Sequence, residues 1–249
     1  MEEIDTILAY KDSLKIIQEK NSFSFSIDST ILSFFVDIKK KTNNIIDLGC
    51  GNGVIPLFLS MFTDKKIYGI EIQKYSFSRA LRSVELNNLS NQITILNDDI
   101  KGISNKLGKD SFGLVVSNPP YFKTNDSSFK NDEECLSIAR HELLITFEEI
   151  IKEANLLLKE GGSFSFIQRT DRFLETIDLL KKYHFSIKRL RFVYPKCGKE
   201  SYVFMMDATK RGKEDGLKVL EPLYIYDGSD YSTEVLSYFH YGEKDEKNK

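Results

Sequence analysis

Short apolar runs alternate with longer helical patterns along most of this chain, from Asn44 to about Met206. The short runs have the length and the bounding polar residues of strands, and the segments between them repeat with the period of a helix. This alternation is typical of β-α-β units, which wind into a mostly parallel sheet with helices on both faces. The sequence therefore predicts a doubly wound α/β fold.

Seven strands are expected, and the last two are expected to form an antiparallel hairpin through the turn at 195–198. The predicted strands are 45–48, 66–71, 93–96, 112–117, 163–168, 187–194 and 201–207. The predicted helices are 54–61, 76–87, 147–158 and 171–183. Gly161 and Gly162 are expected to end the third of these helices, because glycine commonly follows the last helical turn.

The predicted sheet belongs to one domain, residues 41–242. This domain follows an appendage or lid, 1–40, and precedes a tail, 243–249, that is expected to be disordered. The appendage is expected to contain a helix from Ile4 to Glu19 and to pack over the edge of the sheet where ligands bind. Asp28 can cap a helix that begins at Ser29, and the alternative, a part in a lid over the cofactor, is implied only by a resemblance of the segment 23–28 to a known family. The polar segment 123–134 is expected to be a long loop.

A glycine-rich segment, Asp47-Leu48-Gly49-Cys50-Gly51-Asn52-Gly53, leads from the first predicted strand into a helix. Glycines here permit a tight turn and let the backbone approach a ligand closely. Glu71 ends the second strand about 20 residues later, which is the spacing at which an acid accepts hydrogen bonds from a nucleotide ribose. An acid after the third strand, Asp99 in preference to Asp98, is expected to accept from an adenine amine.

The spacing of the glycines discriminates between possible ligands. The third glycine comes one residue too early for the dinucleotide fingerprint, and no Lys-Ser or Lys-Thr follows as in a phosphate-binding loop. The pattern therefore favours S-adenosylmethionine. The expected binding residues are Asp47, Gly49, Gly51, Gly53, Glu71 and Asp99.

A second motif, Asn118-Pro119-Pro120-Tyr121, follows the fourth predicted strand and so lies at the same edge of the sheet. An amine conjugated to a planar ring is a poor nucleophile, and accepting hydrogen bonds from both of its protons draws the lone pair back onto nitrogen. The side-chain oxygen of Asn118 and the carbonyl of Pro119 can supply these acceptors. Pro119 and Pro120 stiffen the turn, and Tyr121 can stack on a flipped base. The motif predicts methyl transfer to an amino group.

Taken together, these motifs resemble the bacterial tRNA1(Val) (adenine(37)-N6)-methyltransferases over nearly the whole chain. The resemblance extends to the segments 15–18, 23–28, 69–73, 139–142 and 190–196. It departs at Asn97-Asp98-Asp99-Ile100, where such enzymes often carry Gly-Asp. The resemblance implies a class I, Rossmann-like methyltransferase fold, S-adenosylmethionine as methyl donor, and the N6 amine of adenine 37 in the anticodon loop as target.

Contact with RNA is expected at local basic sites, because the net charge of the chain is −2 and whole-domain basicity is absent. The segment 181–199 carries basic residues interleaved with aromatic ones and has no acid. Within it Lys188, Arg189 and Arg191 are expected to contact the RNA backbone. Arg140 and His141 are expected either to hold the flipped nucleotide or to cap and pack a helix.

Other readings stay open, because the Asn-Pro-Pro-Tyr motif is shared with protein-glutamine N5-methyltransferases and with rRNA and DNA amino-methyltransferases. A non-catalytic RNA-binding module is disfavoured by the presence of Asn118 and Glu71. No apolar run approaches the roughly 20 residues of a membrane span, and the acidic start lacks the pattern of a secretory signal. We expect a cytoplasmic protein that binds tRNA, without a membrane contact, a metal site or an obligate protein partner.

Overall fold

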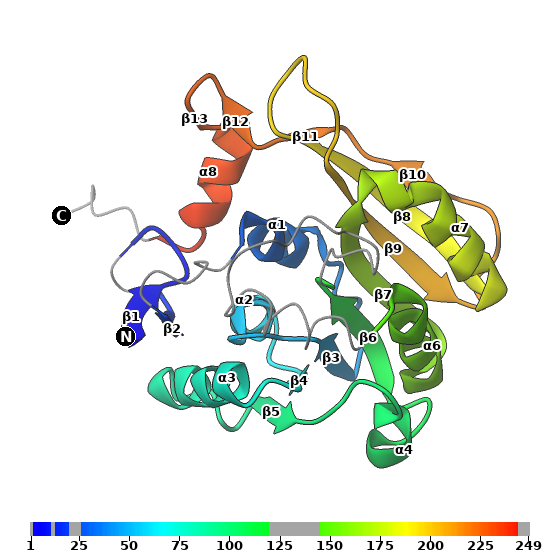
Figure 1. Ribbon diagram of the computed structural model, residues 1–249, viewed down its shortest axis with the longest axis horizontal. Helices are drawn as coiled ribbons and strands as arrows, with labels where there is room; N and C mark the ends of the chain where they lie inside the picture. The colour runs from blue at the N-terminus through cyan, green and yellow to red at the C-terminus, as the bar shows by residue number, and fades with distance from the viewer. Residues whose placement is uncertain (1, 11–12, 20–25, 120–144, 244–249) are drawn as a thin grey trace, which may run out of the picture.

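The computed structural model describes residues 2–10, 13–19, 26–119 and 145–243. Its centre is a sheet in the order β10-β8-β9-β7-β6-β3-β4-β5, with β11 paired to β8 (Figure 1). The seven long strands are β3 (Asn44–Leu48), β4 (Lys66–Glu71), β5 (Ile93–Asn97), β6 (Phe112–Ser117), β7 (Leu158–Arg169), β8 (Phe185–Tyr194) and β9 (Val203–Lys210). All seven were predicted from the sequence.

The strand directions also follow the prediction. Strands β5, β4, β3, β6 and β7 are parallel neighbours, and β9 is antiparallel to both β7 and β8. The mostly parallel sheet of seven long strands with a terminal antiparallel hairpin is therefore confirmed, although the described sheet has nine strands in all. The sequence did not predict β10 (Lys218–Val219) and β11 (Leu223–Tyr224), which pair with the outer edge of β8. Each has two residues, too few to form a recognisable pattern.

Helices cover both faces of the sheet (Figure 1). On one face lie α1 (Ile27–Phe35), α2 (Val54–Ser60) and α3 (Lys74–Leu86), and on the other lie α4 (Ile103–Leu107), α6 (Phe147–Leu157) and α7 (Phe173–Lys182), with a short 3₁₀ turn at Thr170–Arg172. Successive residues of a strand point to opposite faces. Ile45 and Ile46 of β3 are accordingly both fully buried, each in a different one of the two hydrophobic cores.

The carboxyl-terminal part extends beyond the sheet. A short antiparallel pair, β12 (Tyr226–Asp227) and β13 (Asp230–Tyr231), precedes α8 (Thr233–Phe239). Helix α8 lies beside α1 in Figure 1, and the rings of Tyr238 and Phe34 stack with centroids 4.4 Å apart. None of the described helices has the length and apolar character needed to cross a membrane.

The helix predicted from Ile4 to Glu19 is wrong. This segment forms an antiparallel hairpin, β1 (Glu2–Thr6) and β2 (Lys15–Glu19). The other edge of β2 pairs with side chains of α3, because the Lys15 N–H donates to Asn87 at 2.8 Å and the Ile17 N–H donates to Ser83 at 2.9 Å. The hairpin thus packs on α3 and not over the ligand-binding edge, where α1 lies instead.

Two expected helix ends are also corrected. Gly161 and Gly162 lie inside β7, near a shift in its register against β6, and α6 already ends at Leu157. A side chain on Gly162 would approach a backbone oxygen to 2.8 Å, so the strand needs glycine there. Helix α1 begins at Ile27 with Ser26 as its cap, so Asp28 is not the cap that was considered.

Candidate active site

Two motifs meet at the carboxyl ends of three neighbouring strands. Strand β3 lies between β4 and β6 and is parallel to both, so the segments that follow these strands leave the same edge of the sheet. The Ser117 hydroxyl donates to the Leu48 carbonyl at 2.8 Å and ties the end of β6 to the end of β3. The glycine loop and Asn118 are therefore held side by side.

The glycine loop turns sharply before α2. Gly53 caps this helix with φ +87°, and a side chain there would lie 3.2 Å from Cβ of Ala80 in α3. Gly51 also has a positive φ, +54°, but a side chain there would meet no atom within 4 Å. Gly53 thus serves close packing between helices, whereas Gly51 leaves open space on the outer side of the loop.

Glu71, at the end of β4, fixes this loop. Its carboxylate accepts the Gly51 N–H at 2.9 Å and the Gln73 N–H at 2.7 Å. Burial raises the pKa of Glu71, and the two backbone donors oppose that effect. Each carboxylate oxygen can accept a second hydrogen bond, so Glu71 can bind a ribose while it holds the loop.

Asp47 lies beneath the loop and is fully buried in β3. Among the described residues, neither of its carboxyl oxygens has a hydrogen-bond partner, and the same holds for the side-chain oxygen of Asn52. Burial, and then the charge of Glu71, raises the pKa of Asp47 well above its ordinary value. Unpaired buried polar atoms are unusual in proteins, and these lie next to a loop that can bind a ligand.

Asn118 faces the same space as the loop. A cavity of about 190 Å³ is lined by Ser29, Gly49, Cys50, Gly51, Asn52, Val54, Ile55 and Asn118. The side-chain nitrogen of Asn118 donates to the hydroxyl of Ser29 at 3.0 Å and to that of Ser26 at 3.4 Å. The amide oxygen is then the atom that can accept from an incoming amine.

Ser26 and Ser29 were not predicted as site residues. They stand at the start of α1, which the sequence places far from Asn118. Their spacing, with a hydroxyl at the cap and another three residues later, is the signal that could have pointed to this helix end. Their contact with Asn118 depends on the packing of α1 against the sheet.

Comparison with known proteins agrees with this geometry. Residues 13–191 match the methyltransferase small domain. The chain belongs to this family. A relative from Flavobacterium psychrophilum, named tRNA1(Val) (adenine(37)-N6)-methyltransferase, is 25% identical over 82% of this chain and 87% of its own length. A relative of the same name from Pedobacter heparinus is 30% identical over 66% and 74%, respectively.

The fold of this methyltransferase also resembles a crystal structure from Agrobacterium tumefaciens, described as a predicted O-methyltransferase. The TM-score is 0.67, the identity is 21%, and the match covers 86% of this chain and 95% of the other. The class I, Rossmann-like methyltransferase fold and S-adenosylmethionine as methyl donor, both implied by the sequence, are confirmed.

The two aspartates that follow β5 in this methyltransferase differ in their surroundings. Asp98 forms an ion pair with Lys106 at 2.6 Å, which lowers the pKa of Asp98. Asp99 accepts the Lys101 N–H at 2.9 Å, and no described side chain forms an ion pair with it. Neither lines the cavity, so the choice of Asp99 as the adenine contact stays a prediction.

The three basic residues that were expected to contact RNA have partners within the chain. Lys188 donates to two backbone carbonyls of the segment that follows β9. Arg189 donates to the Phe35 carbonyl at 3.0 Å and lies over the Phe35 ring, and Arg191 pairs with Glu234 at 2.7 Å. RNA contact at these residues stays a prediction, and the structure does not favour it. Pro120, Tyr121, Arg140, His141 and the segment 123–134 lie outside the described residues.

Proposed function

We propose that this protein transfers a methyl group from S-adenosylmethionine to the N6 amine of adenine 37 in the anticodon loop of tRNA1(Val). The observation that carries the proposal is the shared cavity, since the glycine loop and Asn118 line the same space. A donor held on the loop therefore lies beside the group that binds an amine. The relatives named for this reaction support the choice of substrate.

The residues present fit the methyl donor. The open space at Gly51 lets a ligand approach the loop backbone, and Glu71 offers acceptors at the end of the adjacent strand. We assign donor binding to Asp47, Gly49, Gly51, Gly53, Glu71 and Asp99. When bound, S-adenosylmethionine supplies an electrophilic methyl group on sulfur.

Asn118 binds and activates the target amine. Its side-chain oxygen accepts one N–H of the amine, and the carbonyl of the buried Pro119 accepts the other. These two hydrogen bonds draw the lone pair out of the ring and aim it at the methyl group. Ser29 holds the amide in the orientation that this requires. No base is needed before transfer, because the amine proton becomes acidic only once the new bond to carbon has formed.

An unpaired adenine suits this site better than a paired one. Extrusion of a base that is already unpaired avoids the few kcal/mol needed to break a base pair. An anticodon loop presents such a base. A protein glutamine is the second candidate substrate, because its side-chain amide also presents a planar, conjugated amino group.

The experiment uses labelled S-adenosylmethionine with a valine tRNA transcript, the same transcript with guanine at position 37, ribosomal RNA, DNA and a release factor. We expect label in the first transcript alone, and N6-methyladenine in its nucleoside digest. The Asn118→Ala variant should lose most turnover but bind the donor as the wild type does. Label in a protein glutamine, or equal label in both transcripts, would overturn the proposal.

A further inference from the structure

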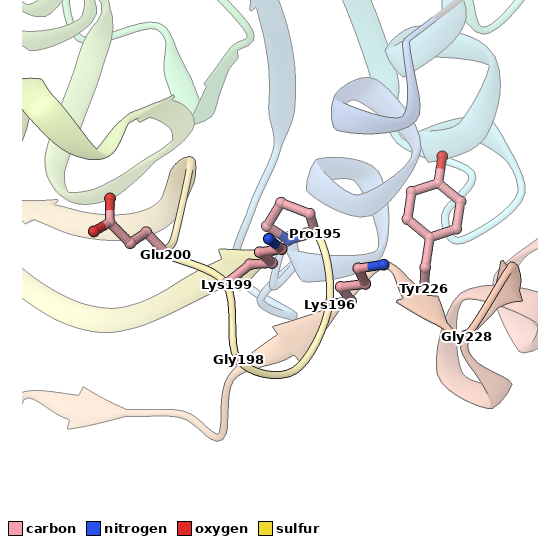
Figure 2. A pocket seen from close by; sticks show the side chains of 7 residues that line it. All are labelled: Pro195, Lys196, Gly198, Lys199, Glu200, Tyr226 and Gly228. Carbon is pink, nitrogen blue, oxygen red and sulfur yellow. The ribbon is translucent and has the colours of Figure 1, made fainter.

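A second, more open pocket lies beyond the end of β8. Its volume is about 690 Å³, and Figure 2 shows the turn between β8 and β9 on one side of it and Tyr226 on the other. It is lined by Pro195, Lys196, Gly198, Lys199, Glu200, Tyr226 and Gly228. None of these residues belongs to the cavity between the glycine loop and Asn118.

Backbone pairing gives this pocket a fixed shape. Tyr226 donates its N–H to the Pro195 carbonyl at 2.9 Å, and the preceding residue donates to the Tyr194 carbonyl at the same distance. The Tyr226 ring stacks on Tyr231, with centroids 5.1 Å apart and planes 14° apart. Tyr226 is still 40% exposed, so part of its ring can contact a ligand.

The pocket lies at the same edge of the sheet as the active site. Strands β7 and β8 run in the same direction, because both are antiparallel to β9, so the turn after β8 leaves the sheet at the carboxyl edge. The turn connects to α1 through Tyr202, whose hydroxyl donates to Asp28 at 3.2 Å. The next residue of α1 is Ser29, which contacts Asn118. The start of α1 therefore contacts both the turn that lines this pocket and the amine-binding group of the active site.

The lining residues carry the chemistry of a nucleic-acid contact. Lys196 and Lys199 are exposed, and within the part of the chain that the structure describes neither ammonium group has an ion pair or a hydrogen bond. Figure 2 shows Lys196 extending from the turn toward Tyr226, whereas Glu200 points to the other side. Two available cations and an aromatic ring that line one pocket suit phosphate groups and a stacked base.

The pocket also lies beyond the part of the chain that matches the methyltransferase small domain. The match to the methyltransferase small domain ends at residue 191, and every lining residue follows that position. Since this pocket lies at the same edge of the sheet as the active site, it is placed to select the substrate.

We propose that this pocket binds the single-stranded RNA that flanks the target adenine. Lys196 and Lys199 each contact a phosphate, and Tyr226 stacks on an unpaired base. This inference rests on the proposed function. It replaces the expected phosphate contacts at Lys188, Arg189 and Arg191 with Lys196 and Lys199, whose ammonium groups form no ion pair or hydrogen bond with a described residue.

The first test combines Lys196→Glu with Lys199→Glu. The matched control combines Lys109→Glu with Lys159→Glu, two exposed lysines. Lys109 shortly precedes β6 and Lys159 is at the start of β7, so both lie at the opposite edge of the sheet. The pocket variant should bind the tRNA at least about tenfold more weakly, and its log-log salt slope should fall by about 0.7–0.9 for each lysine. The control should match the wild type, and both variants should keep wild-type donor affinity.

The second test changes the ring. Tyr226→Ala should raise the KM for tRNA with little effect on kcat, and Tyr226→Phe should behave as the wild type, because stacking does not need the hydroxyl. Equal tRNA affinity and salt slope in the pocket and control variants would overturn this inference while the wild type still methylates tRNA. Absence of RNA methylation by the wild type would instead overturn the proposed function, and the pocket's assignment with it.

Discussion

The side-chain amide of Asn118 can rotate about its last bond, and only one of its two orientations presents the oxygen to the substrate amine. The hydroxyl of Ser29, 3.0 Å from the amide nitrogen, favours that orientation when it accepts the N–H. Ser29 is thus a positioning residue that acts through Asn118. Its role can be separated from that of Asn118 by kinetics.

Ser29→Ala should lower kcat about three- to tenfold, which corresponds to the loss of one hydrogen bond of about 0.5–1.5 kcal/mol. The KM for tRNA and the affinity for S-adenosylmethionine should stay unchanged, because Ser29 positions the amine-binding group alone. Ser29→Thr keeps the hydroxyl and should restore kcat. Steady-state kinetics at saturating donor measures kcat and the KM for tRNA of both variants. A wild-type kcat for the alanine variant would refute the positioning role.

Glu71 holds the glycine loop and offers hydrogen-bond acceptors to the ribose of S-adenosylmethionine, so its replacement should change the affinity for this methyl donor. Glu71→Ala should weaken S-adenosylmethionine binding about tenfold or more, since the loss of a charged acceptor costs about 1.5–3 kcal/mol. Asp98→Ala is the control, because Asp98 is paired with Lys106. Calorimetry that finds equal affinity for wild type and Glu71→Ala would contradict the assignment.

At the scale of elements, the β1–β2 hairpin shows how packing overrides a local pattern. Residues 4–19 have apolar spacings that fit a helix, but β2 gains hydrogen bonds from α3 that a helix would not make. Asn87 both accepts the Lys15 N–H at 2.8 Å and donates to the Lys15 carbonyl at 2.6 Å. The Asn87 side chain, at the end of α3, thus makes the two hydrogen bonds with Lys15 that the backbone of a neighbouring strand would otherwise make.

Asn87→Ala should therefore destabilise the hairpin, by about 1–2 kcal/mol for two lost hydrogen bonds. The expected result is a lower Tm and faster amide exchange in residues 2–6 and 15–19, with kcat unchanged because the hairpin is not at the active edge. The control is Asn91→Ala, because Asn91 is exposed and its side chain forms no hydrogen bond with a described residue. Equal Tm values for the two variants would show that α3 does not hold β2.

At the scale of the whole molecule, buried carboxyl groups link stability to pH. Burial raises the pKa of Asp47, Glu71 and Asp207. A group whose pKa is higher in the folded than in the unfolded protein stabilises the fold at low pH. That contribution is present below the unfolded pKa, about 3.9 for aspartate, and is lost as the pH rises through the folded pKa.

Asp47→Asn removes one such group. Without donor present, the Tm of the wild type minus that of the variant should fall as the pH rises from about 4 toward 8. Thermal melts across this range measure the difference. A constant difference, or one that grows with pH, would show that Asp47 is not protonated more readily in the folded protein.

The sequence determined the sheet, because apolar runs that are buried on both faces leave a strong signal in β3, β4, β6 and β9. It also determined the order of the two motifs, and with it the edge of the sheet to which Asp47, Glu71 and Asn118 belong. Parallel strands deliver whatever follows them to the same edge. These features depend on local patterns that one segment carries by itself, and the structure agrees with them.

The tertiary structure alone decided which side chains from distant segments meet. It placed Ser29 on Asn118, gave Arg189 and Arg191 partners in Phe35 and Glu234, and left Lys196 and Lys199 exposed without an ion pair to a described residue. All four basic residues lie within the same basic segment, 181–199, and the sequence does not distinguish the paired ones from the exposed ones. Whether a cation is available to a ligand depends on the groups that the fold brings against it, and no local pattern contains that information.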